Sequence, residues 1–373
     1  MAIFIVLSVF LIARVSGQYN FIHVEHSAGL SSNNVSGIYK SSQGFLWLAT
    51  QGGLDRYDGE VVKSYIHDPV DSLTISDDYV LDVCEDDDGL IWIGTLNGGV
   101  NVLDPEIGNF RHFRHDPDDP NSLAFDFNKM VFKDNEGDIW ISVHDRGVDR
   151  FNHEINGFDH YIPGRHVQGQ IPRLVNSILS YALDPVDPNI IWLGSMSGVL
   201  KLNKAAREWR HYPIEPNSAL DPSRLFGKEK VIRSMIFDEQ GHLWLGTWGG
   251  GLCRLDTLTG KFRVFRYEGL QPVHGARNSI TDLEVKSEEE LWICTENKGL
   301  GIFNITDEHF SFVIDLANNA NAVPYPFEIL IDEQGTLFVA SQMTGLYYSN
   351  IRAHQFEKTK LPYHLYDVSF TGP

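Results

Sequence analysis

A segment of the form apolar–aromatic–apolar, with Trp at the centre of six copies and Phe at the centre of one, followed by a small or polar pair, recurs seven times along this chain of 373 residues. The central aromatic residues of successive copies are separated by 45, 48, 52, 52, 48 and 46 residues. A period of this length is typical of proteins built from units that stack on one another. The seven central residues are Trp47, Trp92, Trp140, Trp192, Trp244, Trp292 and Phe338.

Each copy contains four short segments with strand patterns, separated by polar or glycine-containing turns. In the second copy they lie within residues 80–89, 91–95, 98–104 and 109–115. Short strands with frequent turns and no sustained helical period predict a four-stranded antiparallel sheet. One such sheet cannot bury both faces, whereas seven sheets in a ring bury theirs against each other. We therefore predict an all-β, seven-bladed β-propeller of four-stranded antiparallel blades, with the repeated aromatic residues buried between blades.

The ends of the repeat region bear on how such a ring closes. Residues 21–26 have the pattern of an outer strand and lead into a first strand, as residues 65–80 do inside the chain. We therefore expect the N-terminal strand to complete the seventh blade, which places the propeller at residues 18–353. Residues 354–373 are then surplus, and we interpret them as the start of a second propeller or as a linker.

The first residues form an apolar run that is too short to cross a bilayer. Residues 2–12 are apolar and Arg14 follows them, which is typical of a secretory signal. We expect a signal peptide at residues 1–17 and an exported protein, periplasmic or otherwise extracytoplasmic. No Lys or Arg precedes the run, so a buried first strand is the alternative interpretation. We expect no membrane span in the rest of the sequence.

The repeat combines a D-x-x-G turn, the Trp segment ending in Gly-Thr, and a Gly-Gly pair before an apolar residue. Residues 72–100 show it most fully, and residues 238–252 repeat its centre. This pattern closely resembles the two-component regulator propeller repeat, and the similarity extends over residues 30 to about 350. The resemblance implies the extracytoplasmic input region of a two-component sensor, often one that detects oligosaccharides. It also implies further domains of the same sensor, or a homodimer partner, outside this chain, and any kinase activity would lie there.

Composition excludes several other functions. The formal net charge of −20 argues against a surface for nucleic acid or for anionic membranes, because both need clustered cations. No catalytic motif is present, and the carboxylates Glu296 and Asp145 lie on separate loops without an evident partner. Three scattered cysteines, Cys84, Cys253 and Cys294, predict small buried side chains. We therefore expect no enzyme, no metal site and no cofactor.

Two further groups of polar residues have structural explanations. The acidic turns at residues 86–89 and 134–138 resemble fragments of calcium loops, but the equivalent turns at 238–241 and 332–335 lack the alternating ligands. Turn chemistry explains all four. Several histidines fall on or beside the polar fourth strands, where we expect them to be solvated: His67, His112, His115, His160 and His211.

Binding is expected in the loops that join second to third strands, because they gather at one mouth of the central channel and differ from blade to blade. Trp248 is suited to stacking on a sugar face, with packing onto a neighbouring blade as the alternative. Arg146 either clamps a carboxylate or pairs with Asp145. The candidate ligand-binding residues are Gln51, Asn97, His144, Arg146, Trp248, Glu296, Asn297 and Gln342.

These observations favour a non-enzymatic sensory input domain that binds an oligosaccharide or another small ligand at the propeller mouth. A secreted, stand-alone propeller that acts as a protein-interaction scaffold is the second interpretation. A propeller lyase or glycosidase is a third, and it would need carboxylates or His and Tyr side chains that converge on the channel.

Overall fold

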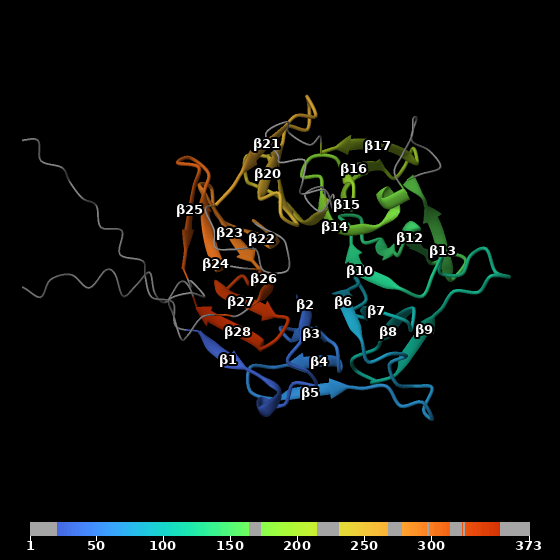
Figure 1. Ribbon diagram of the computed structural model, residues 1–373. Helices are drawn as coiled ribbons and strands as arrows, with labels where there is room; N and C mark the ends of the chain where they lie inside the picture. The colour runs from blue at the N-terminus through green and yellow to red at the C-terminus, as the bar shows by residue number, and fades with distance from the viewer. Residues whose placement is uncertain are drawn as a thin grey trace, which may run out of the picture.

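The seven repeats form seven four-stranded antiparallel sheets arranged as a ring around a central channel (Figure 1). The prediction of a seven-bladed β-propeller is confirmed. This computed structural model describes residues 21–163, 173–214, 231–267, 278–296, 298–313, 323 and 325–350. The predicted signal peptide at residues 1–17 and the tail at 354–373 lie outside these ranges.

Every blade has the same strand order from the channel outwards, so its elements are grouped by position. The innermost strands of blades 1 to 7 are β2 (Val35–Lys40), β6 (Val80–Glu85), β10 (Asn128–Lys133), β14 (Ile178–Leu183), β18 (Ile232–Phe237), β22 (Ile280–Ser287) and β26 (Pro326–Ile331). The second strands are β3 (Leu46–Thr50), β7 (Ile91–Thr95), β11 (Ile139–Val143), β15 (Ile190–Ser195), β19 (Leu243–Thr247), β23 (Glu290–Thr295) and β27 (Thr336–Ser341).

The third strands are largely buried, whereas most of the outermost strands carry exposed residues. The third strands are β4 (Gly53–Tyr57), β8 (Val100–Leu103), β12 (Gly147–Asn152), β16 (Gly198–Asn203), β20 (Leu252–Leu255), β24 (Gly299–Asn304) and β28 (Gly345–Asn350). The outermost strands are β5 (Val62–Tyr65), β9 (Phe110–Phe113), β13 (Gly157–Tyr161), β17 (Glu208–Pro213), β21 (Phe262–Phe265), β25 (His309–Phe312) and, for blade 7, β1 (Ile22–Val24). The 3₁₀ turns η1 (His26–Ala28) and η3 (Arg173–Asn176) are the helical elements of the described residues.

The N-terminal strand closes the ring, as predicted. In blade 7, β1 pairs antiparallel with β28, so that Ile22 faces Tyr348 and Val24 faces Leu346. The His23 ring also stacks on the Tyr347 ring, with centroids 4.2 Å apart. Because the first and last repeats share one sheet, neither end of the propeller can open without breaking this ladder.

The repeated tryptophans are buried between blades, as predicted. All six have at most 1% of their surface exposed, and Phe338, their counterpart in blade 7, has 9%. Trp47 of blade 1, for example, belongs to a cluster that contains Val80 and Ile93 of blade 2. The three cysteines are buried and free, which also agrees with the prediction.

In four blades, a hydrogen bond links an aspartate of the turn between the first and second strands to the tryptophan of the same blade. The Trp244 indole nitrogen donates a hydrogen bond of 2.8 Å to Asp238, whose other oxygen accepts the backbone N–H groups of Gln240 and His242. The same indole-to-carboxylate bond joins Trp92 to Asp86, Trp140 to Asp134 and Trp192 to Asp184. These contacts confirm the interpretation of the acidic turns as turn chemistry.

The histidines on or beside the outermost strands are exposed or half-buried, as expected, and they are also hydrogen-bonded, which was not expected. His67 Nδ1 and His115 Nδ1 each lie 2.7 Å from a main-chain oxygen, of Ile75 and Leu123 respectively. His160 Nδ1 lies 2.7 Å from the buried Asp149 carboxylate, and that bond raises the pKa of His160. The remaining two bond in the same way: His112 to Asn101 and Ser72, and His211 to Ser197.

All seven innermost strands contain the same β-bulge near their start. In β2, Val35 faces Thr50 and Gly37 faces Ala49, so Ser36 is an extra residue with no partner on β3. A bulge bends a strand and redirects the side chain of the extra residue. The equivalent register shift occurs in the other six blades. We call these seven extra residues the bulge ring: Ser36, Leu81, Lys129, Leu179, Arg233, Thr281 and Phe327.

Candidate functional site

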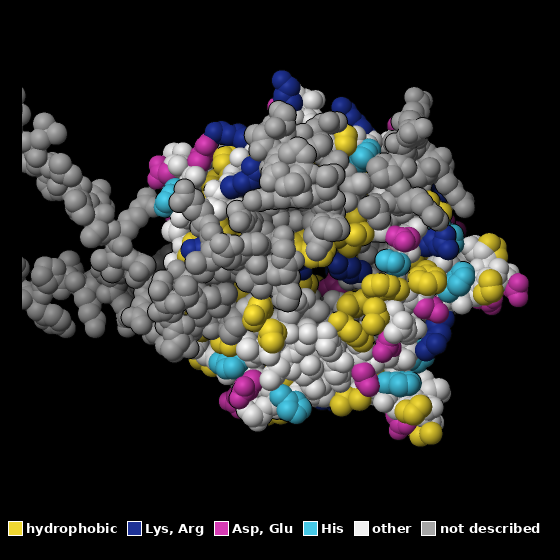
Figure 2. All heavy atoms as spheres, in the orientation of Figure 1, with side chains coloured by type: hydrophobic (Ala, Val, Ile, Leu, Met, Phe, Trp, Pro, Cys, Tyr) yellow, Lys and Arg dark blue, Asp and Glu magenta, His cyan; other side chains and the backbone are white. Residues whose placement is uncertain are grey.

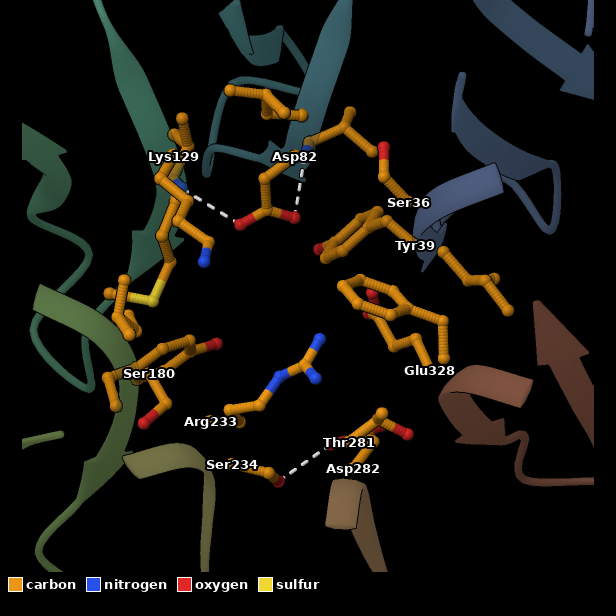
Figure 3. Close-up of a pocket in the computed structure, with 18 of the residues that line it drawn as sticks. Ser36, Tyr39, Asp82, Lys129, Ser180, Arg233, Ser234, Thr281, Asp282 and Glu328 are labelled. Atoms are coloured by element: carbon orange, nitrogen blue, oxygen red, sulfur yellow. Dashed lines mark hydrogen bonds between the residues drawn. The ribbon is translucent and has the colours of Figure 1, made fainter. Parts of the chain in front are cut away.

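The central channel encloses a cavity of about 890 Å³, and all seven members of the bulge ring line it. Figure 3 shows Lys129 of β10 and Arg233 of β18 projecting into this cavity from separate blades. In the space-filling view, Lys and Arg atoms are visible in the hollow at the centre of the ring (Figure 2). The bulges therefore direct polar and charged side chains of otherwise apolar strands into the channel.

The loops between second and third strands lie at one end of the channel, as predicted. In every blade, the first residue of the loop donates its backbone N–H to the carbonyl of a residue at or just before the start of the innermost strand. The pairs are Gln51–Asn34, Leu96–Tyr79, His144–Phe127, Met196–Ser177, Trp248–Val231, Glu296–Ser279 and Gln342–Tyr325. We call this end of the channel the mouth.

Glycine keeps these loops tight against their blades. Gly251, which ends the loop of blade 5, has a φ of 95°, and a Cβ atom there would lie 2.3 Å from the carbonyl oxygen of Phe265. Any other residue at this position would adopt an unfavourable positive φ, and its Cβ atom would push the outermost strand away. The loop residues that precede this glycine are consequently held at fixed positions around the mouth.

Arg233 unites two of the predicted site residues. Its guanidinium forms an ion pair with Glu296 of the neighbouring blade and lies 5.8 Å from the centre of the Trp248 ring. The Phe327 ring is on another side of the same guanidinium, 5.3 Å away. Trp248 is only partly buried, so it both packs onto Arg233 and remains open at the mouth. The two interpretations of Trp248 are therefore not exclusive.

The other predicted residues fall into two groups. Gln342 lines the channel, Gln51 donates a hydrogen bond of 2.7 Å to the Tyr79 hydroxyl, and His144 stacks on Phe127 at 4.7 Å. In blade 2, by contrast, Leu96 lines the channel while Asn97 is exposed beside it.

Arg146 is exposed at the loop surface. Within the described residues, Asp145 accepts a hydrogen bond from Ser177 and approaches His144, rather than pairing with Arg146. The expectation that Asp145 and Glu296 lack partners is thus wrong for both. Asn297 lies outside the described residues.

One residue beyond the bulge ring, three carboxylates tie neighbouring innermost strands together. Asp82 of blade 2 accepts the Val131 N–H of blade 3 at 2.9 Å, and Asp282 of blade 6 accepts the Ile329 N–H of blade 7 at 2.8 Å. Glu328 accepts a backbone hydrogen bond from Ile38 and so connects blade 7 to blade 1. We call Asp82, Asp282 and Glu328 the bracing carboxylates. They satisfy main-chain donors at the points where the innermost strands diverge.

Burial changes the charge of these groups. Removal from bulk water raises the pKa of Asp82 to about 7 and that of Asp282 to about 6. Burial, reinforced by repulsion from Asp282, raises the pKa of Glu284, deeper in the channel, to about 8. Burial and the nearby aspartates also raise the pKa of Glu328 well above its ordinary value. Near neutral pH, Glu284 therefore holds a proton and adds little negative charge, and the raised pKa of Glu328 favours its protonated form.

Lys129 differs from three other buried or half-buried cations, Lys133, Lys204 and Arg233. Burial and repulsion by Arg233 lower its pKa to about 8. Within the described part of the chain, Lys133 pairs with Asp87, Lys204 with Asp134 and Arg233 with Glu296, whereas Lys129 takes part in no ion pair. Its ammonium faces the channel without a protein anion to neutralise it.

Reasoning from the sequence missed the bulge ring and the bracing carboxylates. It assigned recognition to loops. One signal was available: Lys129 directly precedes the apolar residues Met130–Phe132 of β10, and Arg233 stands among the apolar residues of β18. A cation inside a segment that otherwise predicts a buried strand indicates a side chain that reaches a cavity or a partner.

Two further features concern the described residues alone. They contain no group of three or more His, Cys, Asp or Glu side chains arranged to hold a metal ion. None of their helices is long and apolar enough to span a bilayer.

Sequence comparison identifies the repeat. The family described as "Two component regulator propeller" matches residues 29–52, 74–97 and 227–249, which cover the first two strands of blades 1, 2 and 5. No curated protein matches the sequence significantly.

Structural comparison finds propellers of several kinds. The extracellular domain assigned to the hybrid two component system BT3049 of B. thetaiotaomicron has a TM-score of 0.71 and 22% identity, over 89% of this chain and 42% of that one. The extracellular domain assigned to the one component system BT4673 of the same organism has a TM-score of 0.63 and 19% identity, over 88% and 42%. Virginiamycin B lyase from Staphylococcus aureus has a TM-score of 0.63 and 12% identity, over 89% and 98%.

The present chain thus spans less than half of the two extracellular domains and nearly all of the lyase. At these identities the likeness concerns the fold, and the family match covers three of the seven repeats. The chain is a seven-bladed β-propeller that carries the repeat of the two component regulator propeller family.

Proposed function

We propose that this propeller is the extracytoplasmic input region of a regulatory sensor and that it binds an oligosaccharide at the mouth of its channel. The observation that carries the proposal is the cluster formed by Arg233, Trp248, Phe327 and Glu296. It combines a partly open indole with charged groups held at fixed positions, at the entrance of a cavity large enough for a small ligand.

The mouth suits a saccharide because it offers flat apolar faces together with hydrogen-bonding groups. The Phe127 ring, stacked on His144, adds an aromatic surface, and the Tyr79 hydroxyl with Gln51 adds polar atoms. Sugar rings present an apolar face to aromatic side chains and hydroxyls to amides and charges. A purely apolar ligand would leave these polar groups unsatisfied.

Two observations support a sensory role outside the cytoplasm. The apolar run at residues 2–12 has the length of a secretory signal. Both similar extracellular domains belong to proteins assigned to one or two component systems. Because β1 fastens the ring, ligand binding would move the propeller as a rigid body against further domains or a second copy of the chain.

The test is ligand-dependent stabilisation of the purified protein, measured by thermal unfolding with a panel of neutral and acidic oligosaccharides. A ligand at 100 times its dissociation constant adds about 2.7 kcal/mol to the stability of the folded state. In the Trp248→Ala variant this protection should disappear, with a small loss of stability without ligand. Trp209→Ala is the matched control, since Trp209 packs between blades 3 and 4. It should lose stability yet keep the protection.

Two results would contradict the proposal. If Trp248→Ala keeps full protection by a bound oligosaccharide, the binding site is elsewhere. If no oligosaccharide protects the wild-type protein, the alternative role as a protein-interaction scaffold gains support, and affinity capture with the immobilised propeller becomes the appropriate experiment.

We further propose that the propeller is not catalytic. An enzymatic role has one observation in its favour, since Asp82, Asp282, Glu284 and Glu328 converge on the channel. Each bracing carboxylate, however, accepts a main-chain N–H of the next blade, which is a structural use. Chromatography of oligosaccharides after prolonged incubation with the protein tests this proposal. New products that are abolished in the Glu284→Gln variant would establish catalysis.

A further inference from the structure

The bulge ring places two cations from blades 3 and 5 at the same depth in the channel. Lys129 and Arg233 occupy equivalent positions, each the extra residue of its innermost strand. They are close enough for Arg233 to disfavour the charged form of Lys129. Two like charges directed into one cavity oppose folding, so their arrangement calls for an explanation beyond stability.

The two cations are not equally neutralised by protein groups. Arg233 has Glu296 as an ion-pair partner, and two aromatic rings cover its guanidinium. For Lys129 the described residues supply no carboxylate within ion-pair distance, although Lys133 of the same strand pairs with Asp87 at 2.8 Å. A negatively charged group between the cations would relieve their repulsion and give Lys129 its partner.

The carboxylates further along the strands do not prevent this. Asp82 and Asp282 direct oxygens at backbone N–H groups of the next blade, and Asp282 also accepts a hydrogen bond of 2.7 Å from Ser234. Burial raises the pKa of Glu284 to about 8 and also raises the pKa of Glu328, which favours the protonated form of both. In that form they are hydrogen-bond donors to a ligand rather than anions that repel it.

We propose that the channel binds the negatively charged group of an acidic oligosaccharide between Lys129 and Arg233. This inference rests on the proposed function and names the class of saccharide. The Trp248 ring and the polar side chains at the mouth would hold the sugar rings, while the carboxylate or sulfate of one unit reaches the two cations. Without the charge of Lys129, the same channel and mouth would bind neutral and acidic sugars equally well.

A calorimetric binding experiment tests the inference with ligands that differ in charge alone. Oligogalacturonates of two to six units are compared with their methyl esters, because esterification removes the charge and retains the ring hydroxyls. Sulfated disaccharides and inorganic sulfate are the further probes. They distinguish a uronate from a sulfated sugar, and a saccharide from a free anion.

We expect the wild-type protein to bind an acidic oligosaccharide at least tenfold more tightly than its uncharged counterpart. In Lys129→Met this preference should disappear while the uncharged ligand still binds. Lys133→Met is the matched control, four residues along the same strand and paired with Asp87, and it should keep the preference. Thermal unfolding of each variant verifies that it is folded.

The outcomes separate the two proposals. Equal or tighter binding of the methyl esters, or a preference that survives in Lys129→Met, overturns the inference and leaves the proposed function standing. Binding of inorganic sulfate as tight as that of every saccharide overturns the saccharide part of the inference. If no charged or neutral oligosaccharide binds, both proposals fail.

The pH dependence supplies a second readout. The titratable and charged groups that line the channel with Lys129 are Tyr39, Tyr79, Asp82, Cys84, Lys133, Tyr181, Arg233, Asp282, Glu284 and Glu328. Between pH 6 and pH 9, Lys129 loses its proton with a pKa of about 8, while Asp82 and Glu284 become negative with pKa values of about 7 and about 8. The affinity for the acidic oligosaccharide should therefore fall from pH 6 to pH 9, and the affinity for the uncharged one should change far less. Parallel profiles for the two ligands would contradict the inference.

Discussion

The contacts between blades and the lining of the channel follow opposite rules within the same repeat. Between blades, a tryptophan is repeated in six of seven copies, and four of those indoles donate to an aspartate of their own blade. In the bulge ring, the equivalent positions hold Ser, Leu, Lys, Leu, Arg, Thr and Phe. The backbone is the same in every blade, but the side chain is nearly constant at the tryptophan position and differs from blade to blade in the bulge ring.

This difference separates two tasks. The repeated aromatic residues bury large surfaces and fix the distance between blades, so each substitution there changes stability. The bulge ring is positioned by the same backbone but faces a cavity, so its side chains contribute little to packing. A propeller can therefore change what it recognises without changing how it folds.

The largest expected effect is on the blade contacts. Trp244→Ala should reduce the free energy of unfolding by about 3–5 kcal/mol, because the indole is fully buried between blades 5 and 6. Urea unfolding followed by circular dichroism measures this change. An unaltered unfolding curve would show that the repeated tryptophan does not hold the blades together.

A smaller loss is expected at the turn aspartate. Asp238→Ala removes the acceptor of the Trp244 indole and of two backbone N–H groups, which should cost roughly 1–3 kcal/mol. Ser41→Ala is the matched control, because Ser41 occupies the equivalent turn of blade 1 and receives no indole bond. Equal losses in the two variants would mean that the indole bond adds nothing to the turn.

The channel carboxyls predict how stability depends on pH. The pKa of Glu284 is higher in the folded protein, at about 8, than in the unfolded chain, so the folded state holds the proton more tightly. Its contribution to stability is present at low pH and is lost as the pH rises towards 8. The melting temperature should therefore fall between about pH 5 and pH 8, and Glu284→Gln should reduce that fall. A variant with the wild-type slope would exclude this group as a cause.

The smallest expected effect on stability concerns the bulge ring itself. Lys129→Met removes a half-buried charge that Arg233 repels, so the free energy of unfolding should stay the same or rise by up to about 1 kcal/mol. Urea unfolding of this variant beside Trp244→Ala makes the comparison within one experiment. A loss of several kcal/mol would show that Lys129 is a structural residue and would remove the distinction between the two regions.

The fold could be predicted because its determinants are repeated. The spacing of the tryptophans specifies the number of blades, and the pattern of residues 21–26 predicts the closing strand. The bulges could not be predicted, since a single extra residue within six leaves the apolar pattern of the strand unchanged. The backbone acceptors of His67 and His115 were missed for a related reason, because main-chain carbonyls leave no mark in the sequence.

The candidate site could be predicted in part. The mouth and its loops follow from the topology of a propeller, and Trp248 is conspicuous because it lies outside the repeat. The ion pair of Arg233 with Glu296 joins residues 63 positions apart on neighbouring blades, and pairing over such a distance depends on the bulge that turns Arg233 inwards. Lys129 could have been recognised from the sequence, because it is a cation directly before the apolar residues of a predicted strand.

Hydrogen exchange of the propeller, with and without the oligosaccharide that stabilises it best, tests most directly whether the mouth is the binding site. We expect protection to increase in the loops between second and third strands and at the start of the innermost strands, above all in peptides containing Lys129, Arg233 and Trp248. Protection confined to the outermost strands, or to the turns that carry Asp86, Asp134 and Asp238 at the other end of the blades, would contradict it.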